Sequence, residues 1–239
     1  MPLPGGVQAV LTDVEGTTTP LRFVTGTLFP FALERLAEFV AAGGERAEEA
    51  LDQIRQEYGR EPPSANPPAF GCGAPYAAWL MACDRKSTGL KMLQGLIWEQ
   101  GYRRGELRGE VFPDVPAALI GWTAASIRLR VFSSGSVLAQ RLLFAHTPYG
   151  DLSTFFEGYH DTTTGPKQAP GSYTLIARAI GLPPPAVLFL SDTVPELDAA
   201  RDAQMRTGLL LRPGNCPTES GGHPVYSDFT SLIGCTCVR

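Results

Sequence analysis

The sequence predicts an α/β protein built on a doubly wound, Rossmann-like parallel sheet, and three observations support this fold class. Short apolar runs of strand length recur along the chain, with helical segments between them. Such alternation is typical of parallel strands joined by right-handed crossovers. Several runs end abruptly in polar residues, and one long helical block interrupts the alternation after the first run. We therefore expect an α/β core that carries an inserted helical domain.

The composition is that of an ordinary soluble globular protein. The 239 residues are 44% hydrophobic and 18% charged, which suits one large domain or one domain with an insertion. The net charge of −4 does not indicate a protein that binds nucleic acid or an anionic membrane. No apolar run approaches the roughly 20 residues that span a bilayer, and the N-terminus lacks a signal-peptide pattern. We therefore expect a cytoplasmic protein with no nucleic-acid or membrane partner.

The five cysteines form no CxxC pair. An odd number of cysteines without a secretory signal favours reduced thiols. Cys235 and Cys237 near the C-terminus could bind a metal or be redox-active, but two thiols lack the other ligands that zinc requires.

The elements of the first half follow from hydrophobic spacing and from glycine and proline. The first apolar run lies within residues 7–19 and has the composition of a buried strand. Helical spacing and loop residues then predict helices over 27–42 and 45–58, a loop over 59–75, and a helical stretch over 76–108. We expect this last stretch to break near Arg85 and again near Gly101.

Strands and helices alternate from Val111 onward. The pattern predicts helices over 115–125, 137–144, 171–180 and 196–203, and strands over 127–132, 186–190 and 206–211. It also predicts a short strand or extended segment over 155–159 and a short closing element over 229–233. The expected domains are an α/β core of residues 1–20 and 111–239, and an all-helical cap of residues 21–110 inserted after the first strand.

Chemically reactive side chains stand at the ends of three predicted strands. They are Asp13 and Glu15 after the first, Ser133 and Ser134 after the second, and Asp192, with Glu196 and Asp198 nearby, after the third. Lys167, one of only three lysines, lies in a polar segment between the second and third of these strands. Because the carboxyl ends of parallel strands face one crevice, we expect these side chains to converge.

The residue types indicate phosphoryl chemistry. Asp13 and Asp192 could hold Mg²⁺, a hard cation that takes few protein carboxylates and leaves positions for substrate phosphate. With metal and Lys167 neutralising charge, a carboxylate can attack phosphorus and form an aspartyl-phosphate intermediate. Ser133, Ser134 and the amides at the following helix start can bind phosphate oxygens. Glu15, expected on the same side of the strand as Asp13, can protonate the leaving oxygen and later activate water.

Each residue also has a purely structural interpretation. Asp13, Glu15 and Asp192 could be turn or N-cap acids, and Lys167 a surface lysine. Ser133 and Ser134 could cap the helix that begins at Val137. For Glu196 and Asp198 we favour the role of helix N-terminal acids over that of metal ligands.

The ordered set resembles the haloacid dehalogenase-like hydrolase superfamily, whose members share this core and often carry a mobile cap after the first motif. Four segments are similar to the enolase-phosphatases, or acireductone synthases, within it: residues 13–23, 84–98, 132–136 and 212–215. Glu15 stands where most phosphatases of the superfamily have aspartate. The chain departs from the pattern at Ser191, where many relatives have threonine, and at Pro166, which precedes Lys167.

The resemblance implies a phosphoric monoester hydrolase of methionine salvage. It would convert 2,3-diketo-5-methylthiopentyl-1-phosphate to the acireductone 1,2-dihydroxy-3-keto-5-methylthiopentene and phosphate, as a monomer with one Mg²⁺ per subunit. Asp13, Glu15 and Asp192 would be the metal-site residues, with Glu15 contributing its backbone carbonyl. Asp13 and Glu15 would be catalytic, and the substrate-binding residues would be Ser133, Ser134 and Lys167.

Three other functions remain open at this point. One is a phosphatase of another small phosphorylated metabolite, without an enolase step. A second is a non-catalytic binding protein, which would be expected to lack Asp13, Lys167 or Asp192. The third is a haloacid dehalogenase, which needs no Mg²⁺ and therefore does not need the acids at Glu15 and Asp192. The residue that removes the enolising proton is also left open, with Glu15 one candidate.

Overall fold

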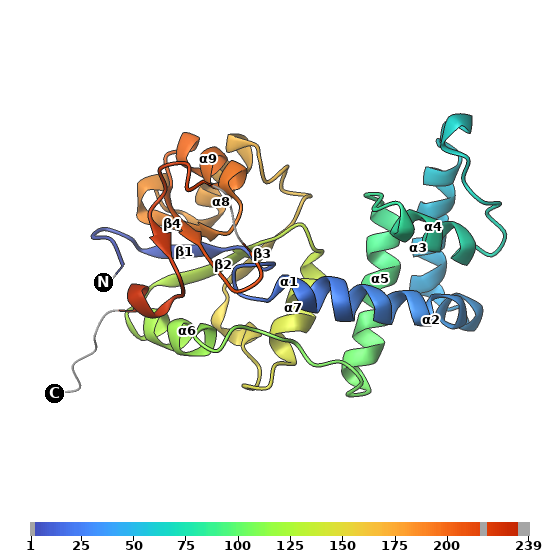
Figure 1. Ribbon diagram of the computed structural model, residues 1–239, viewed down its shortest axis with the longest axis horizontal. Coiled ribbons are helices and arrows are strands. Elements are labelled where there is room, and N and C mark those ends of the chain that lie inside the picture. Colours follow the sequence, from blue (N-terminus) through green and yellow to red (C-terminus); the bar gives the residue numbers. More distant parts are fainter. Residues whose placement is uncertain (1–2, 216–218, 234–239) are drawn as a thin grey trace. The chain divides into compact units, whose positions relative to one another are not determined.

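The computed structural model describes residues 3–215 and 219–233, and it divides into two compact units (Figure 1). The first unit comprises Met1–Phe23 and Arg108–Arg239, and the second comprises Val24–Leu107. The predicted metal or redox tail at Cys235 and Cys237 lies outside the described residues. No helix in the described ranges has the length and apolar character needed to cross a membrane.

The first unit is built on a parallel sheet, which confirms the predicted fold class. Within the described residues the sheet has six strands in the order β3-β2-β1-β4-β5-β6. The strands are β1 (Ala9–Thr12), β2 (Arg128–Phe132), β3 (Gly158–His160), β4 (Val187–Ser191), β5 (Arg206–Leu210) and β6 (Val225–Tyr226). Every neighbouring pair in this sheet is parallel. β6 was not predicted, because a strand of two residues is too short to show a pattern.

Helices cover both faces of this sheet. They are α6 (Val115–Ala124), α7 (Val137–Ala145), α8 (Pro170–Ile180) and α9 (Val194–Asp202), with 3₁₀ turns at Ser153–Phe155, Pro184–Ala186 and Thr230–Leu232. Figure 1 shows α8 and α9 on one face and α6 and α7 on the other. All residues of β1 and β4 are buried, as expected for central parallel strands covered on both sides. The single helical turn α1 (Leu21–Phe23) also belongs to this unit.

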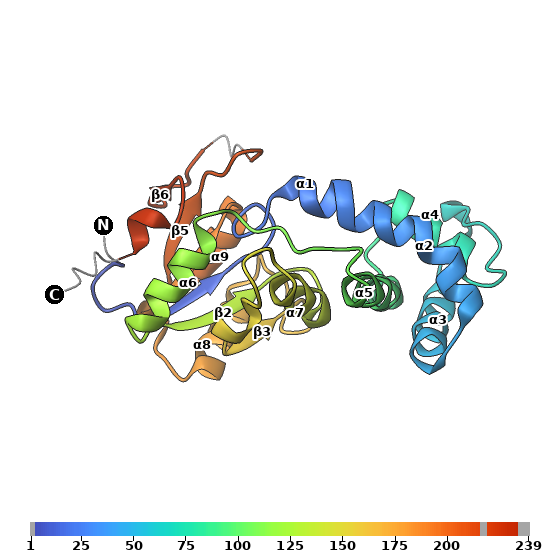
Figure 2. The ribbon, with the colours of Figure 1, turned by 90° about the horizontal axis from the view of Figure 1, so that it is seen from below.

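The second unit is all-helical in its described residues. After a π-helical segment at Val24–Leu28 come α2 (Phe29–Ala42), α3 (Glu45–Tyr58), a 3₁₀ turn at Pro63–Ala65, α4 (Ala74–Ala82) and α5 (Thr88–Arg103). Figures 1 and 2 show α2 running across α5 and leading into α3. α3 and α5 approach closely at Gly89, where a Cβ would lie 2.7 Å from the backbone nitrogen of Ile54. Glu57 on α3 accepts hydrogen bonds from the first amides of α5, those of Thr88 and Gly89.

The break expected near Gly101 comes slightly later, because α5 ends at Arg103. A Cβ at Gly101 would lie 2.6 Å from Cε1 of Phe31 and 3.0 Å from Cδ1 of Leu107. The glycine therefore makes room for an aromatic ring from α2 and does not end the helix. Sequence spacing cannot distinguish these two uses of glycine within a helix.

Candidate active site

The carboxyl ends of β1, β2 and β4 form one edge of the sheet, with β1 in the middle. Thr12, the last residue of β1, pairs with Val131 on one side and Leu190 on the other. The three strands therefore end within about one residue of each other, and the chain order reverses between β1 and β4. Ligands of open α/β sheets bind at this kind of switch point. It is also the place where Asp13, Ser133 and Asp192 leave their strands.

The loop after β1 is a tight turn that buries Asp13. The Asp13 amide donates a hydrogen bond to Leu190 O at 2.9 Å, and the residue is 4% exposed. The carbonyl of Val14 accepts hydrogen bonds from the amides of residues 17, 18 and 19. Gly16 has φ +72°, and a Cβ there would collide with the Asp192 carboxylate. Glycine is thus required at this position both for the turn and for the approach of Asp192.

Lys167 lies between two carboxylates in the interior of the site. Its Nζ is 2.6 Å from Asp13 Oδ1 and 2.6 Å from Glu196 Oε2. The three side chains are 9%, 6% and 13% exposed, so this is a buried ion-pair group. The proline before Lys167 does not displace it, because Tyr173 Oη donates to Lys167 O at 2.6 Å and Ser172 Oγ donates to Pro166 O at 2.7 Å. Both anchors come from α8.

The pKa values in this group reflect burial and mutual charge. Burial lowers the pKa of Lys167, but the charges of Asp13 and Glu196 outweigh it and the pKa is raised above its ordinary value. Burial and the nearby Asp13 carboxylate raise the pKa of Glu196 to about 7. The same two causes, in the same order, raise the pKa of Asp192. Three carboxylates thus face one ammonium group, an excess of negative charge that a cation would relieve.

Asp192 follows β4 and is held at both carboxylate oxygens. Its Oδ1 accepts from Thr193 Oγ1 at 3.1 Å, and its Oδ2 accepts from Asn215 Nδ2 at 3.1 Å. The N-cap position of α9 is Thr193, and no side chain caps this helix. The alternative of Asp192 as an N-cap is therefore wrong.

The serines in the turn after β2 make different contacts. Ser133 is 2% exposed, and its Oγ accepts a hydrogen bond from the Gly135 amide at 3.0 Å. The N-cap of α7 is Ser136, which accepts from the Ala139 amide at 3.3 Å. Capping by Ser133 or Ser134 is therefore wrong, and Ser134 lies exposed at the strand end.

Glu15 lies in the turn and is half-buried. It forms a single parallel bridge with Thr19. Because β1 ends at Thr12, strand alternation does not extend to Glu15 and does not place its side chain on the same side as Asp13. The turn keeps Glu15 in the same loop as Asp13.

Two residues contact the predicted site residues in ways that the sequence analysis did not predict. Glu196 does lie in the first turn of α9, as predicted, but it also pairs with Lys167 and accepts from Ser191 Oγ at 3.1 Å. Asp198, on the same helix, instead pairs with Arg201 near the surface. Asn215 reaches Asp192 from beyond β5; its segment, 212–215, showed the family resemblance, but no local pattern around it indicates this contact.

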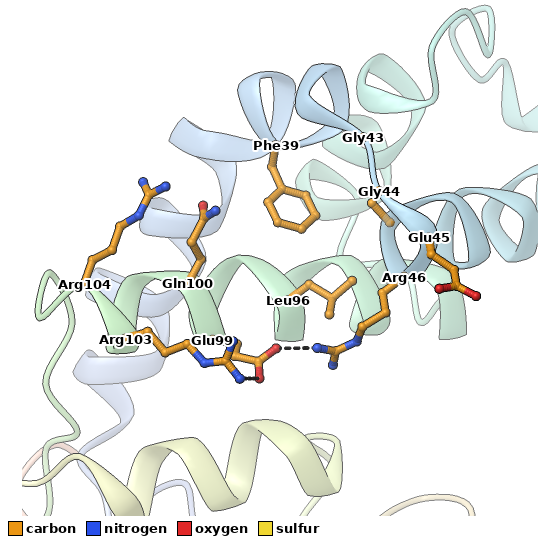
Figure 3. Close-up of a pocket in the computed structure, with 11 residues that line it drawn as sticks. Phe39, Gly43, Gly44, Glu45, Arg46, Leu96, Glu99, Gln100, Arg103 and Arg104 are labelled. Atoms are coloured by element: carbon orange, nitrogen blue, oxygen red, sulfur yellow. Dashed lines mark hydrogen bonds and ion pairs between the residues drawn. The ribbon is translucent and has the colours of Figure 1, made fainter.

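A separate hollow of about 580 Å³ lies in the helical unit, between α2, the start of α3 and α5 (Figure 3). Glu99 in this hollow pairs with Arg46 and Arg103, each at 2.7 Å. None of the predicted site residues line it. We therefore assign the candidate active site to the strand ends and not to this hollow.

The donor set at the strand ends suits Mg²⁺. Within the described residues, no group of three or more histidine, cysteine, aspartate or glutamate side chains is arranged to hold a metal ion. Mg²⁺ needs no such cage, since it is held by one or two carboxylates and keeps other positions for water and phosphate. The raised pKa of Asp192, caused by its burial and by Asp13, marks two carboxylates that repel each other and that a divalent cation would stabilise.

Comparison with known proteins agrees with this fold. Residues 7–204 match the family of haloacid dehalogenase-like hydrolases, and the chain belongs to this family. Solved members with lower identity share the fold alone. CbbY from Rhodobacter sphaeroides, in complex with phosphate, is 18% identical with a TM-score of 0.59, covering 95% of this chain and 96% of that chain.

Within the family, the chain belongs with the enolase-phosphatases. It is 48% identical to Enolase-phosphatase E1 of Synechococcus elongatus, covering 97% of this chain and 100% of that protein. It is 47% identical to Enolase-phosphatase E1 of Azotobacter vinelandii, covering 97% and 99%. The crystal structure of the UTR4 protein of Saccharomyces cerevisiae is 34% identical with a TM-score of 0.77, covering 95% of this chain and 100% of that chain.

Proposed function

We propose that this protein is an Mg²⁺-dependent enolase-phosphatase of methionine salvage. It converts 2,3-diketo-5-methylthiopentyl-1-phosphate to 1,2-dihydroxy-3-keto-5-methylthiopentene and phosphate. The observation that carries the proposal is the buried contact of Lys167 Nζ with Asp13 Oδ1 at 2.6 Å, at the end of the central strand. The 48% identity to an enolase-phosphatase over nearly the whole chain supports the choice of reaction.

In this proposal, Asp13 is the nucleophile. A carboxylate oxygen of Asp13 attacks phosphorus, the ester bond from phosphorus to the substrate oxygen breaks, and an aspartyl phosphate forms. Water then attacks that phosphorus and releases phosphate and the free carboxylate. Asp13 is 4% exposed, so its charge is poorly solvated and its orientation is determined by the protein.

Lys167 orients the Asp13 carboxylate. The ammonium group contacts Asp13 Oδ1 and leaves the second carboxylate oxygen for attack. Glu196 holds the lysine from the opposite side, also at 2.6 Å. As the phosphoryl group arrives, the same ammonium neutralises its charge, which would otherwise repel the carboxylate.

Phosphate oxygens would bind at the start of α7. Ser133 and Ser134 stand at the end of β2, next to the central strand and just before this helix. We assign these serines and Lys167 to substrate binding. An ion pair or hydrogen bond to the transferring phosphoryl group is worth most in a site from which water is excluded.

Asp13, Asp192 and the backbone carbonyl of Glu15 would hold Mg²⁺, one per subunit. When bound, the ion supplies Lewis-acid stabilisation of charge on phosphate and carbonyl oxygens. The chain's own proton carrier would be the Glu15 carboxylate, which protonates the leaving oxygen and then takes a proton from water. For the enolase step, a base removes a proton from the carbon beside the dicarbonyl and the carbonyl oxygen gains one, and Glu15 is our candidate for that base.

We further assign the helical unit, Val24–Leu107, the role of the cap domain of an enzyme that acts on a small phosphorylated substrate. Its insertion directly after the first motif supports this role, because the loop that carries Asp13 and the cap then share one short connection. We propose a cytoplasmic, monomeric enzyme.

The test is an assay with two signals on the diketo phosphate. Release of inorganic phosphate measures the phosphatase step, and ultraviolet absorbance of the enediol product measures enolisation. Both signals should appear together and should require Mg²⁺. Phosphate release from other small phosphate esters without the enediol signal would favour the phosphatase alternative, and no turnover of any ester would reject the proposal.

A further inference from the structure

A segment from a strand that does not border β1 reaches the candidate active site. β4 separates β5 from β1, yet residues 212–215, which follow β5, contact the loop after β1. Arg212 Nε donates a hydrogen bond to Thr17 O at 2.9 Å. Asn215 Nδ2 donates one to Gly16 O at 2.7 Å. Two consecutive carbonyls of the nucleophile loop are thus held by side chains from one segment.

Arg212 fixes this segment to the α/β unit. Its guanidinium makes two parallel hydrogen bonds to Asp114, at 2.8 and 2.9 Å. Its Cζ lies 4.5 Å from the ring centre of Phe112 and 4.7 Å from that of Phe229. The Arg212 side chain is 2% exposed. A forked, stacked arginine of this kind has little freedom, so the segment that it begins is rigid.

The amide of Asn215 joins three partners. Its Oδ1 accepts from the Arg212 amide at 2.7 Å, and its Nδ2 donates to Gly16 O and, at 3.1 Å, to Asp192 Oδ2. Gly16 O and the Asp192 carboxylate can only accept a hydrogen bond, and the Arg212 amide can only donate one. The orientation of the Asn215 side-chain amide is therefore determined. Aspartate has the same size but lacks both N–H donors. An asparagine is therefore specifically suited to this position.

We propose that Asn215 is a positioning residue that ties the Asp192 carboxylate to the Gly16 peptide. It thereby sets the separation of Asp192 from Asp13, the two carboxylates that we assign to Mg²⁺. The inference rests on the proposed function, because it takes these two residues as the metal ligands. The missing Cβ of Gly16 fits the same arrangement, since a Cβ would collide with the Asp192 carboxylate and lie 3.2 Å from Asn215 Nδ2.

The experiment measures Mg²⁺ binding to the full chain without substrate, by calorimetry and by the Mg²⁺ dependence of thermal unfolding. Asn215→Ala removes the donors, and Asn215→Asp replaces them with acceptors that repel Gly16 O and Asp192. Losing a residue that orients a metal ligand should weaken Mg²⁺ affinity roughly 10- to 100-fold. Phosphatase activity of Asn215→Ala should recover as Mg²⁺ is raised, which a general structural defect would not allow.

The matched control is Asn66→Asp. Asn66 is the other asparagine of the chain, lies between α3 and α4 in the helical unit, and adopts φ 47°, a backbone conformation that aspartate tolerates. The substitution makes the same change of charge and should leave Mg²⁺ affinity unchanged.

Wild-type Mg²⁺ affinity in both Asn215 variants would overturn the proposal. If circular dichroism shows that either variant does not fold, the Mg²⁺ affinity of Asn215→Ser tests the proposal instead. This variant keeps one hydrogen-bond donor, so its Mg²⁺ affinity should be intermediate. A wild-type protein that binds Mg²⁺ but does not convert the diketo phosphate would reject the proposed function, while the Asn215 comparison would still decide the positioning role. Absence of Mg²⁺ binding to the wild type would reject both.

Discussion

Both units of the molecule have exposed ion pairs, but among the described residues the α/β unit also pairs cations that are buried. In the described part of the helical unit, each arginine that pairs with an acid keeps at least 36% of its side chain exposed. In the α/β unit, the Lys167 side chain is 9% exposed between Asp13 and Glu196, and Arg212 is 2% exposed against Asp114. The buried cations lie at the strand ends that carry the candidate site, or hold the loop beside it.

Exposed and buried ion pairs contribute differently to stability, and the difference indicates which of them serve catalysis. An exposed ion pair contributes about 0–1 kcal/mol, because water screens it. A buried ion pair loses the hydration of both charges, and apolar residues in its place often stabilise a fold equally well. The burial of Lys167 with two carboxylates therefore points to a catalytic use. The pairs of the helical unit, such as Arg103 with Glu99, need no such explanation.

The largest expected effect is on turnover. Asp13→Asn removes the nucleophile and should lower phosphate release by about 10⁴-fold or more, as expected for the loss of a group that forms the covalent intermediate. Asp52→Asn, at an exposed aspartate of the helical unit, makes the same chemical change and should leave turnover unchanged. Single-turnover phosphate release measures both variants. Equal rates in the two would show that the site has been assigned to the wrong unit.

Lys167→Gln should affect both turnover and stability. It leaves the carboxylates of Asp13 and Glu196 buried without their cation, which costs on the order of 3 kcal/mol in the free energy of unfolding. Arg103→Gln breaks an exposed pair and should cost less than about 1 kcal/mol. Urea denaturation followed by circular dichroism measures the two losses. Similar values for both would contradict the contrast between buried and exposed pairs.

Two glycines with positive φ offer a narrower comparison. Gly71→Ala in the helical unit places a Cβ where nothing lies within 4 Å, so only the left-handed backbone opposes it, at about 1–2 kcal/mol. Gly16→Ala carries the same strain and must also displace the Asp192 carboxylate. We expect Gly16→Ala to lower both the melting temperature and Mg²⁺ affinity, and Gly71→Ala to lower the melting temperature alone. Unchanged Mg²⁺ affinity in Gly16→Ala would show that Asp192 does not depend on this approach.

The smallest expected effect is a pH dependence of stability. The three histidines all lie in the α/β unit. Burial, and then the charge of Arg130, lower the pKa of His160, whose Nε2 is buried with no hydrogen-bond partner among the described residues. The unfolded chain therefore binds this proton at higher pH than the folded chain does, and stability should fall as the pH drops below about 6.5.

His160→Gln isolates this contribution. The difference in unfolding free energy between wild type and variant should change between pH 7 and pH 5, with the wild type losing more stability at the acid end. Thermal unfolding at a series of pH values measures the difference. A constant difference would show that His160 is not protonated differently in the folded and unfolded chains.

Much of the fold followed from local patterns. The alternation of strands and helices predicted the parallel sheet, because strands covered on both faces are continuous apolar runs. The break near Arg85 is confirmed between α4 and α5, where Ser87 caps the new helix. The break expected near Gly101 comes at Arg103, and Gly101 itself lies within α5, where it makes room for the ring of Phe31, a residue distant in sequence. Contacts of this kind leave no periodic signal in the chain.

Sequence alone placed Asp13, Ser133 and Asp192 at strand ends, because hydrophobic runs that stop at polar residues are a local property. Only the tertiary structure brought Glu196 to Lys167 and Asn215 to Asp192, because these contacts depend on how α9 and the segment after β5 pack on the sheet. The tertiary structure also shows that Ser136 caps α7 and that β1 ends before Glu15. A side chain that orients another is identified from the residue that it contacts. When that residue is distant along the chain, only the folded structure shows the contact.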